Sequence, residues 1–357
     1  FKLLAVPMRE VVRIHASSGT TGQPITAGYT RRDLDTWAEC IARIATAGGA
    51  TADDIAQVSF GYTLFTGAFG LHGGLEKIGC AIIPISSGNT ERQINIMRDF
   101  GSTVLIATPS YAMHICEVGE KLGFDWEKSQ LRVGLFGGEP CPPGLKQEIE
   151  SRMHIVCTDN YGLTEVMGPG VSGECEYKCG MHINEDCFLA EIIDPDTGEV
   201  LPEGTQGELV FTSITKQAFP LLRYRTRDIC ILRREACPCG RTHIKMCRPM
   251  GRSDDMLIVK GVNVFPSQIE EVMMSFPEIA AQYQLILTRR GPLDHVELQV
   301  EPVPDFPFDE IRRLEQLKRD LGAALKSNLQ IKVDVKIVEP KTIARSEGKA
   351  KRIIDLR

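Results

Sequence analysis

The stretch TVLIATPSYAMHICEVGEKL, residues 103–122, decides the fold class of this chain. Residues 103–107 form a short apolar run that predicts a strand, and Pro109 is expected to open a helix that continues to about Leu122. The same order recurs around this stretch, with strands expected at 55–62, 80–85, 132–136 and 154–158 and a helix at 91–100. Strands that alternate with helices predict an α/β fold, in which helices cover both faces of a parallel sheet.

Residues 30–33 predict the start of an earlier helix. Thr30 is placed to cap the helix, and Asp33 is placed to reach back to it, which is the spacing of a capping box. Apolar residues follow at helical intervals, at Leu34, Trp37, Ile41 and Ile44.

The pattern changes after about residue 170. Short strands are expected at 190–193, 208–212 and 229–233, and the turn sequences at 194–198 and 202–204 separate them. This part of the chain therefore predicts a small antiparallel β section appended to the parallel sheet.

A second domain is expected to follow. It contains a predicted helix at 268–276, predicted strands at 296–301 and 332–338, and leucines on one helical face at 314, 317, 321, 325 and 329. The chain thus predicts a large N-terminal domain over 1–253 and a small α+β C-terminal lid domain over 254–357. The short boundary between them predicts a hinge rather than a tether.

Composition excludes several classes of protein. The 357 residues are 43% apolar and carry a formal net charge of −6, which speaks against a nucleic-acid partner held by bulk charge. No apolar run approaches the roughly 20 residues of a membrane helix. The first residues do not resemble a signal peptide, so a cytoplasmic location is expected and most of the twelve cysteines are expected to be reduced. A start without Met suggests a fragment or a processed chain.

The strongest local motif is Ser17-Ser18-Gly19-Thr20-Thr21-Gly22-Gln23-Pro24. Its glycines free the backbone to fold around an anion, and its four hydroxyls add donors. The Gly-Lys-Ser/Thr ending of a Walker loop is absent. Taken alone, the segment has two interpretations, a phosphate-binding loop and a plain surface turn.

Two further motifs have a nucleotide-binding and a structural interpretation. Residues 160–165, Asn-Tyr-Gly-Leu-Thr-Glu, follow a predicted strand, and ligands collect at such strand ends in α/β sheets. Residues 224–228 end in Asp228, whose carboxylate suits the two hydroxyls of a ribose. The alternatives are a polar loop for the first and a surface ion-pair cluster for the second.

The last two motifs lie toward the C-terminus. Residues 251–255 and 260–266 straddle the domain boundary, where Arg252 is suited to fork onto phosphate. Residues 346–352, Ser-Glu-Gly-Lys-Ala-Lys-Arg, form a basic tail. Taken alone, a basic tail is normally a solvated one.

In this order the five motifs resemble the adenylate-forming enzymes, and several segments are closer still to phenylacetate–coenzyme A ligases. Those segments are 17–24 followed by 28–30, 137–139, 223–228 and 251–271. The resemblance covers essentially the whole chain. Members of the family usually carry several dozen residues before the point where this chain starts, so the N-terminal domain is expected to be incomplete. Relatives often have Lys where this chain has Gln23, which is expected to weaken one phosphate contact.

The resemblance implies a reaction in two steps. An arylacetic acid, with phenylacetate expected, is joined to the α-phosphate of ATP with release of pyrophosphate, and the acyl group is then transferred to coenzyme A with release of AMP. Magnesium and a homodimer are also implied. Hydroxyphenylacetate, indoleacetate and benzoate remain open as substrates, and an adenylyltransferase that uses no coenzyme A is the rival activity.

The resemblance also implies roles for individual residues. Lys349 would bridge the carboxylate and the α-phosphate, Glu165 would hold Mg²⁺, and Thr164 would bond the phosphate. The nucleotide-binding set is Ser17, Ser18, Gly19, Thr20, Thr21, Gly22, Gly137, Gly138, Glu139, Asn160, Tyr161, Gly162, Asp228 and Arg252. Asp254 aligns with the hinge position of the family, and Lys260 and Gly261 align with the segment that lies at the coenzyme A tunnel. Phe60, Tyr62 and Phe65 with Gly138 are the acyl-pocket candidates, with core packing as the alternative.

A separate set of residues predicts a structural zinc site. Cys237 and Cys239 form a tight thiolate pair, and Cys175 and His182 fall in the antiparallel section, which is expected to fold against it. Three thiolates and one imidazole close a tetrahedral site. Cys179, His243 and Cys247 are further candidates, and reduced cysteines in a surface loop are the alternative.

Overall fold

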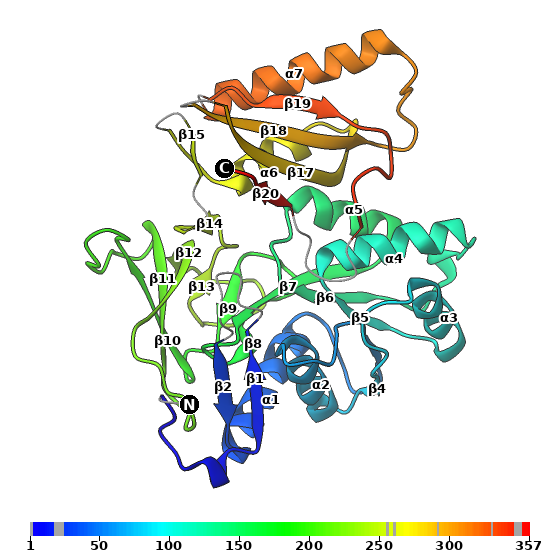
Figure 1. Cartoon of the computed structure of the whole chain (residues 1–357). Helices are drawn as coiled ribbons and strands as arrows, with labels where there is room; N and C mark the ends of the chain where they lie inside the picture. The colour runs from blue at the N-terminus through cyan, green and yellow to red at the C-terminus, as the bar shows by residue number, and fades with distance from the viewer. Residues whose placement is uncertain are drawn as a thin grey trace.

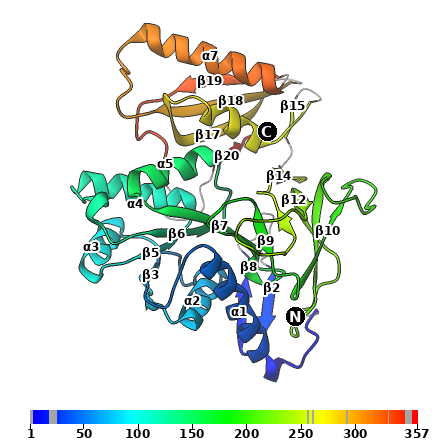
Figure 2. The same cartoon turned by 180° about the vertical axis from the view of Figure 1, so that it is seen from behind.

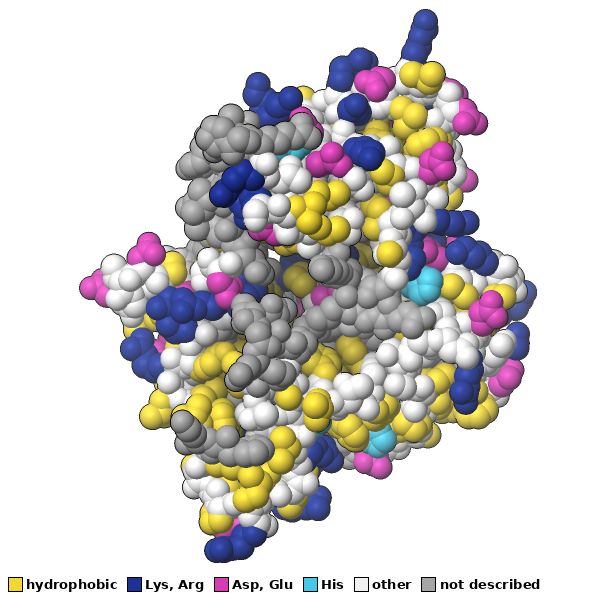
Figure 3. Space-filling view, in the orientation of Figure 1, with side chains coloured by type: hydrophobic (Ala, Val, Ile, Leu, Met, Phe, Trp, Pro, Cys, Tyr) yellow, Lys and Arg dark blue, Asp and Glu magenta, His cyan; other side chains and the backbone are white. Residues whose placement is uncertain are grey.

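The computed structural model describes residues 3–17, 25–254, 257–259, 262–290, 293–329, 331–345 and 352–357. A large domain is built on one twelve-stranded sheet, and a small domain with its own four-stranded sheet lies over α4 and α5 (Figures 1 and 2). The α/β architecture with a C-terminal α+β domain is as expected. Acidic and basic side chains are interspersed on the face shown in Figure 3. Among the described residues, no helix is long and apolar enough to cross a membrane.

Five strands form the parallel half of the large sheet, in the order β7-β6-β5-β3-β4. Their bounds are β3 (Ile55–Val58), β4 (Ala81–Ile83), β5 (Val104–Ala107), β6 (Val133–Gly137) and β7 (Val156–Leu163). The fully buried residues of β5 confirm the apolar run that predicted a strand there. Parallel strands buried on both faces favour such continuous apolar runs.

The antiparallel half continues the same sheet from β7 through β8 and does not form a separate layer. Its strands are β8 (Gly168–Glu174), β9 (Met181–Ile183), β10 (Phe188–Ile193), β11 (Gln206–Ser213), β12 (Tyr224–Arg233), β13 (Lys245–Met246) and β14 (Gly251–Arg252). The expected strand at 229–233 is therefore only the second half of β12. A hairpin of β1 (Arg13–Ala16) and β2 (Thr26–Tyr29) forms a separate two-stranded sheet.

The helices of the large domain are α1 (Arg31–Ala47), α2 (Gly67–Ile78), α3 (Thr90–Phe100), α4 (Pro109–Lys121) and α5 (Pro143–Met153), with 3₁₀ turns η1 (Met8–Glu10) and η2 (Trp126–Lys128). The capping box at the start of α1 is confirmed, because Asp33 N donates to Thr30 Oγ1 and Thr30 N donates to Asp33 Oδ2. Fully buried residues of α1, Trp37 and Ile41 among them, belong to the main core of the domain.

The small domain has the strand order β19-β18-β17-β20. Its elements are a hairpin of β15 (Leu257–Val259) and β16 (Val262–Val264), then α6 (Pro266–Met274), β17 (Ile279–Arg290), β18 (Leu293–Pro302), α7 (Ile311–Leu329), β19 (Asp334–Ile337) and β20 (Ile353–Asp355). The predicted leucine face of α7 is buried from Leu317 onward, and it packs on the apolar face of this sheet.

Candidate active site

The candidate site begins where β6 and β7 end side by side. Gly137 pairs with Asn160, and Asn160 Nδ2 donates to Phe136 O at 2.6 Å. A side chain at position 137 would place its Cβ only 2.6 Å from Asn160 O, and Gly138 has a φ of +84°, so both glycines are required by the backbone. The motif at 137–138 and the motif at 160–162 therefore form one continuous edge.

Tyr161 connects this edge to the predicted ribose carboxylate. Its hydroxyl donates to Asp228 Oδ2 at 2.5 Å, although 67 residues separate the two in sequence. The centre of the Tyr161 ring lies 6.3 Å from that of the Phe211 ring. Strand β14 pairs with β12 so that Arg252 stands opposite Asp228, and Arg252 Nη1 lies 3.7 Å from its Oδ1. Three predicted nucleotide-binding residues thus converge.

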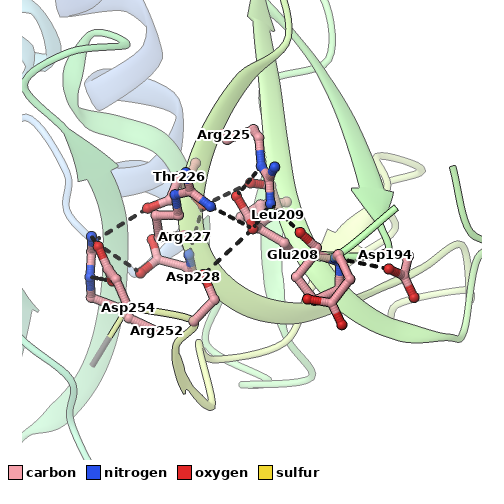
Figure 4. A network of polar contacts seen from close by, with 12 residues as sticks. Asp194, Glu208, Leu209, Arg225, Thr226, Arg227, Asp228, Arg252 and Asp254 are labelled. Atoms are coloured by element: carbon pink, nitrogen blue, oxygen red, sulfur yellow. Dashed lines mark hydrogen bonds and ion pairs between the residues drawn. The ribbon is translucent and has the colours of Figure 1, made fainter. Parts of the chain in front are cut away.

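Arg252 also binds the predicted hinge residue. Its Nε and Nη2 donate to the two carboxylate oxygens of Asp254, each at 2.8 Å, and its Nη1 donates to Thr226 O at 3.3 Å (Figure 4). The guanidinium therefore lies between the predicted ribose site and the predicted hinge.

Glu208 binds the strand that carries Asp228, and the sequence analysis did not identify it. Its carboxylate is completely buried and accepts two hydrogen bonds from Arg225, at 2.6 and 2.9 Å, with Arg227 at 3.6 Å (Figure 4). Burial opposes ionisation, but the hydrogen bonds and charge of Arg225 outweigh it and hold the pKa of Glu208 below its ordinary value. Strand β12, which carries Asp228, is therefore tied to an ionised buried group.

The loop that carries Thr164 and Glu165 is held in place by buried side chains. They donate hydrogen bonds to four backbone carbonyls in the loop and at the start of β8. Lys216 Nζ donates to Val166 O at 3.0 Å and lies 3.4 Å from Glu165 O. The Tyr29 hydroxyl donates to Met167 O at 2.8 Å, and Trp37 Nε1 donates to Pro169 O at 2.7 Å. Buried donors satisfy these carbonyls. Thr164 is itself buried, with its hydroxyl 3.2 Å from that of Thr66.

Lys216 is a second residue that sequence reasoning missed. It is 4% exposed, its ammonium lies 4.6 Å from the centre of the Tyr29 ring, and it forms no ion pair with a described carboxylate. Burial lowers its pKa to about 8, although the negative charges of Asp33 and Glu165 oppose this shift. A lysine in such a place is identifiable only from its three-dimensional surroundings.

Replacing Lys216 with methionine is expected to change how stability depends on pH. The folded pKa is about 8 and the ordinary value is 10.5. Between these values the unfolded chain holds a proton that the folded chain has released, so the stability of the wild type rises with pH. Relative to K216M, its free energy of unfolding should rise by about 3 kcal/mol across that interval. Urea unfolding of both proteins at several pH values measures this difference, and a difference independent of pH would contradict the assignment.

The predicted phosphate loop is only partly described. Ser18, Gly19, Thr20, Thr21 and Gly22 lie outside the described residues. Ser17 is described: its N donates to Ile25 O at 2.9 Å, and its Oγ accepts from Ile25 N at 3.1 Å. These bonds extend the β1–β2 pairing to the two ends of the loop.

The acyl-pocket candidates lie between β3 and α2. Phe60 is buried in the main core. The Tyr62 hydroxyl lies 2.9 Å from His72 Nδ1, and its ring meets that of Phe69 edge-on at 5.2 Å. Phe65 is half-buried against Gly67. Lys349, Lys260 and Gly261 lie outside the described residues.

The four predicted zinc ligands come together in the antiparallel half of the large sheet. The ligand atoms of Cys175, His182, Cys237 and Cys239 all lie within 4.8 Å of one another. Cys175 Sγ is 3.6 Å from Cys237 Sγ, and Cys239 Sγ is 3.5 Å from His182 Nε2. His182 is buried, which lowers its pKa to about 4 and keeps the ring neutral.

The other zinc candidates do not join this group. Cys179 is exposed, and Cys247 Sγ lies 3.5 Å from Cys230 Sγ. The His243 ring centre is 6.4 Å from that of His182. Among the described residues, the group of four is the one that could hold a metal ion.

Comparisons with known proteins agree with this geometry. The family described as AMP-binding enzyme matches residues 5–215, and the AMP-binding enzyme C-terminal domain matches residues 261–357. The chain is 47% identical to a phenylacetate-coenzyme A ligase of Escherichia coli and 45% identical to one of Thermus thermophilus; the matches cover 100% of this chain and 82% and 83% of those proteins.

Solved structures of 2-hydroxyisobutyryl-CoA ligase are similar over nearly the whole chain. The postadenylation state in complex with 2-HIB-AMP matches with a TM-score of 0.92 at 27% identity, over 99% of this chain and 75% of that one. The thioesterification state matches with a TM-score of only 0.67 at 28% identity, over 98% and 75%. The arrangement of the two domains here is therefore more similar to the postadenylation structure of that relative than to its thioesterification structure.

Proposed function

The chain belongs to the phenylacetate–coenzyme A ligases of the AMP-binding enzyme family, and from that premise we propose how its residues divide the reaction. The enzyme activates an arylacetic acid with ATP, through an acyl-adenylate, and transfers the acyl group to coenzyme A. The 47% identity over the whole chain carries this conclusion. Phenylacetate is the proposed preferred acid.

We propose that Asp228 binds the two ribose hydroxyls of ATP. A carboxylate accepts hydrogen bonds from both hydroxyls, and the contacts of Asp228 with Tyr161 and Arg252 hold its orientation. The edge formed by Gly137, Gly138 and Asn160 would frame the adenine, together with Glu139, Tyr161 and Gly162. This part of the nucleotide site would therefore be ordered before ATP binds.

In the proposed first half-reaction, two anions must meet, so positioning and positive charge matter more than a base. The loop at 17–22 would cradle the β- and γ-phosphates, and Thr164 would donate to phosphate. Lys349 would lie between the substrate carboxylate and the α-phosphate. The fixed carbonyls of the loop at 165–169 support the placement of the Thr164 and Glu165 side chains.

Magnesium fits the donor set at this loop. Glu165 is half-buried and offers a carboxylate directly after Thr164 in the sequence, and hard cations prefer such oxygen ligands. When bound, the ion would neutralise phosphate charge. The buried Lys216 would hold the backbone of Glu165 in place.

In the proposed second half-reaction, coenzyme A attacks the acyl-adenylate after the small domain has rotated. Asp254 is the proposed hinge, and its two hydrogen bonds with Arg252 would form in the adenylation arrangement and break on rotation. Rotation would bring the segment with Lys260 and Gly261 toward the pantetheine tunnel and withdraw Lys349. Gating of this kind separates the two steps.

The proposed acyl pocket is formed by Phe60, Tyr62 and Phe65 with Gly138. Aromatic walls suit a flat ring, and an edge-to-face contact contributes about 0.5–1.5 kcal/mol beyond the burial of area. A homodimer and a cytoplasmic location stay predictions.

ATP consumption with a panel of aryl acids, with and without coenzyme A, tests this function. The expected products are AMP and an arylacetyl thioester identified by mass, with the thioester dependent on coenzyme A. Phenylacetate should be the most efficient of the acids. An AMP adduct that accumulates equally with and without coenzyme A, and no thioester, would favour an adenylyltransferase.

We further propose that Cys175, His182, Cys237 and Cys239 hold a structural zinc ion. A tetrahedral zinc ion with Zn–S bonds of about 2.3 Å places its sulfur ligands ~3.8 Å apart. The 3.6 Å separation of the Cys175 and Cys237 sulfurs supports this geometry. Four protein ligands leave no open position for water, so the ion would join β8, β9 and the loop before β13 and take no part in the reaction.

A further inference from the structure

Two arginines stand on either side of residues 346–351 in the sequence, and both reach from the small domain to the same helix of the large domain. Arg345 contacts Glu117 of α4, and Arg352 contacts Ser110 of α4. In Figure 1 the segment that follows β19 runs down to the large domain beside α4. Both contacts therefore cross the boundary between the domains.

Arg345 is held mainly by its own domain. Its Nη1 and Nη2 donate to the two oxygens of Glu301, each at 2.9 Å, and Glu301 is 1% exposed. The backbone of Lys341 and Ile343 also donates to Glu301. The remaining edge of the guanidinium faces Glu117, with Nε at 3.2 Å and Nη2 at 3.4 Å. Glu117 is thus the large domain's contribution to a three-group ion cluster.

Arg352 repeats this arrangement on the other side. Within the small domain it forms an ion pair with the buried Glu270 of α6, and its guanidinium lies 4.8 Å from the centre of the Tyr283 ring. Toward the large domain, its Nη2 lies 3.3 Å from Ser110 Oγ. The amide of Ser110 donates to Glu139 at 2.7 Å, which links this contact to the motif at 137–139.

The spacing of the two contacts on α4 is significant. Ser110 and Glu117 are seven residues apart, so they lie two turns apart on one face of the helix, about 10 Å along its axis. The contacts with Glu301 and Glu270 move with the small domain, whereas those with Ser110 and Glu117 exist only while the small domain has the orientation seen here. That orientation matches the postadenylation state of a relative and not its thioesterification state.

We propose that Glu117 is a positioning residue for the adenylation half-reaction. It acts through Arg345, which precedes Lys349 by four residues, and it stabilises the orientation in which that lysine serves the first step. This inference rests on the proposed role of Lys349. The Glu117 and Arg345 side chains are 18% and 17% exposed, so solvent screens their attraction only in part.

The test compares Glu117→Gln with a control on the same helix. Glu120 of α4 also binds an arginine with both oxygens, at 2.7 and 2.9 Å, but its partner Arg152 lies in α5 of the same domain. Glu120→Gln therefore removes a similar pair that domain rotation leaves intact. Adenylate formation is measured as pyrophosphate release with phenylacetate and ATP, and thioester formation is measured from pre-made phenylacetyl-adenylate and coenzyme A.

E117Q is expected to slow adenylate formation about tenfold and to leave thioester formation unchanged or faster, because only one of two orientations is destabilised. E120Q should alter both rates less than about twofold. The difference between the adenylate-formation rates of the wild type and E117Q should shrink as KCl rises from about 0.02 to 0.5 M. Salt screens the Glu117–Arg345 ion pair, which only the wild type has. A deficit that does not depend on salt would count against the role of the ion pair.

Equal losses in both half-reactions, or no loss in adenylate formation, would overturn the inference. If the wild type itself forms neither adenylate nor thioester, the proposed function fails, and the inference that rests on it fails too. If the wild type is active and E117Q does not show the selective loss, the inference alone fails.

Discussion

Lys349→Ala is expected to reduce the rate of adenylate formation by at least about a thousandfold. In this step a carboxylate attacks a phosphate, and both carry negative charge. A single ammonium between them stabilises the transition state far more than the separated substrates, so its loss falls on the rate rather than on substrate binding. Pyrophosphate release under single-turnover conditions measures the effect.

The second half-reaction provides the control within the same variant. If the small domain rotates between the steps, Lys349 is withdrawn before coenzyme A attacks, and K349A should convert pre-made phenylacetyl-adenylate to the thioester within about twofold of the wild-type rate. Lys326→Ala, at an exposed position of α7, should leave both rates unchanged. Equal loss of both half-reactions in K349A would contradict the role assigned to Lys349.

Cys237→Ser is expected to remove the bound zinc and to lower the melting temperature by about 10 °C. The ion would link three separate segments of the large domain, and its loss would leave the buried His182 and Cys175 and the half-buried Cys239 without it. Elemental analysis of the purified protein and thermal denaturation measure the two effects.

Cys179→Ser is the matched control for the zinc prediction. Cys179 lies four residues from Cys175 but is exposed, with its Sγ near Tyr177 O. The C179S protein should retain about one zinc ion per chain and the melting temperature of the wild type. Zinc content that is the same in C237S and in the wild type would refute the ligand assignment.

Much of the fold follows from local patterns. The apolar run at β5, the capping box at α1 and the leucine face of α7 each depend on neighbours in sequence, and each is found where expected. Helix α2 was not predicted. It contains Gly70 and Gly74, which disfavour a helix intrinsically. A Cβ at position 74 would lie 2.1 Å from Ile41 Cγ2, so these glycines serve the close packing of α1 and α2.

Strand β12 shows a different reason for a missed boundary. The polar sequence at 224–228 resembles a loop, yet it pairs with β11 across a register shift between Glu208 and Val210. Arg227 has a φ of +69° within this stretch. The buried charge of Glu208 makes the polar strand possible, and no local pattern reveals that partner.

The candidate site also contains residues that local motifs predict and residues that only the folded structure identifies. Asn160, Tyr161, Asp228 and Arg252 belong to short motifs, and the structure brings them together. Lys216, Glu208 and Glu117 have no motif around them. Their importance depends on partners 50, 17 and 228 residues away, at Val166, Arg225 and Arg345. Such pairings become visible only when the chain is folded.

The most direct measurement is a single-turnover reaction with phenylacetate and ATP in the absence of coenzyme A, followed by a chase with coenzyme A. The account predicts a burst of about one pyrophosphate per active site, enzyme-bound phenylacetyl-adenylate, and its conversion to phenylacetyl-CoA with AMP release during the chase. No pyrophosphate before coenzyme A is added, or an adenylate that the chase does not convert to thioester, would contradict it.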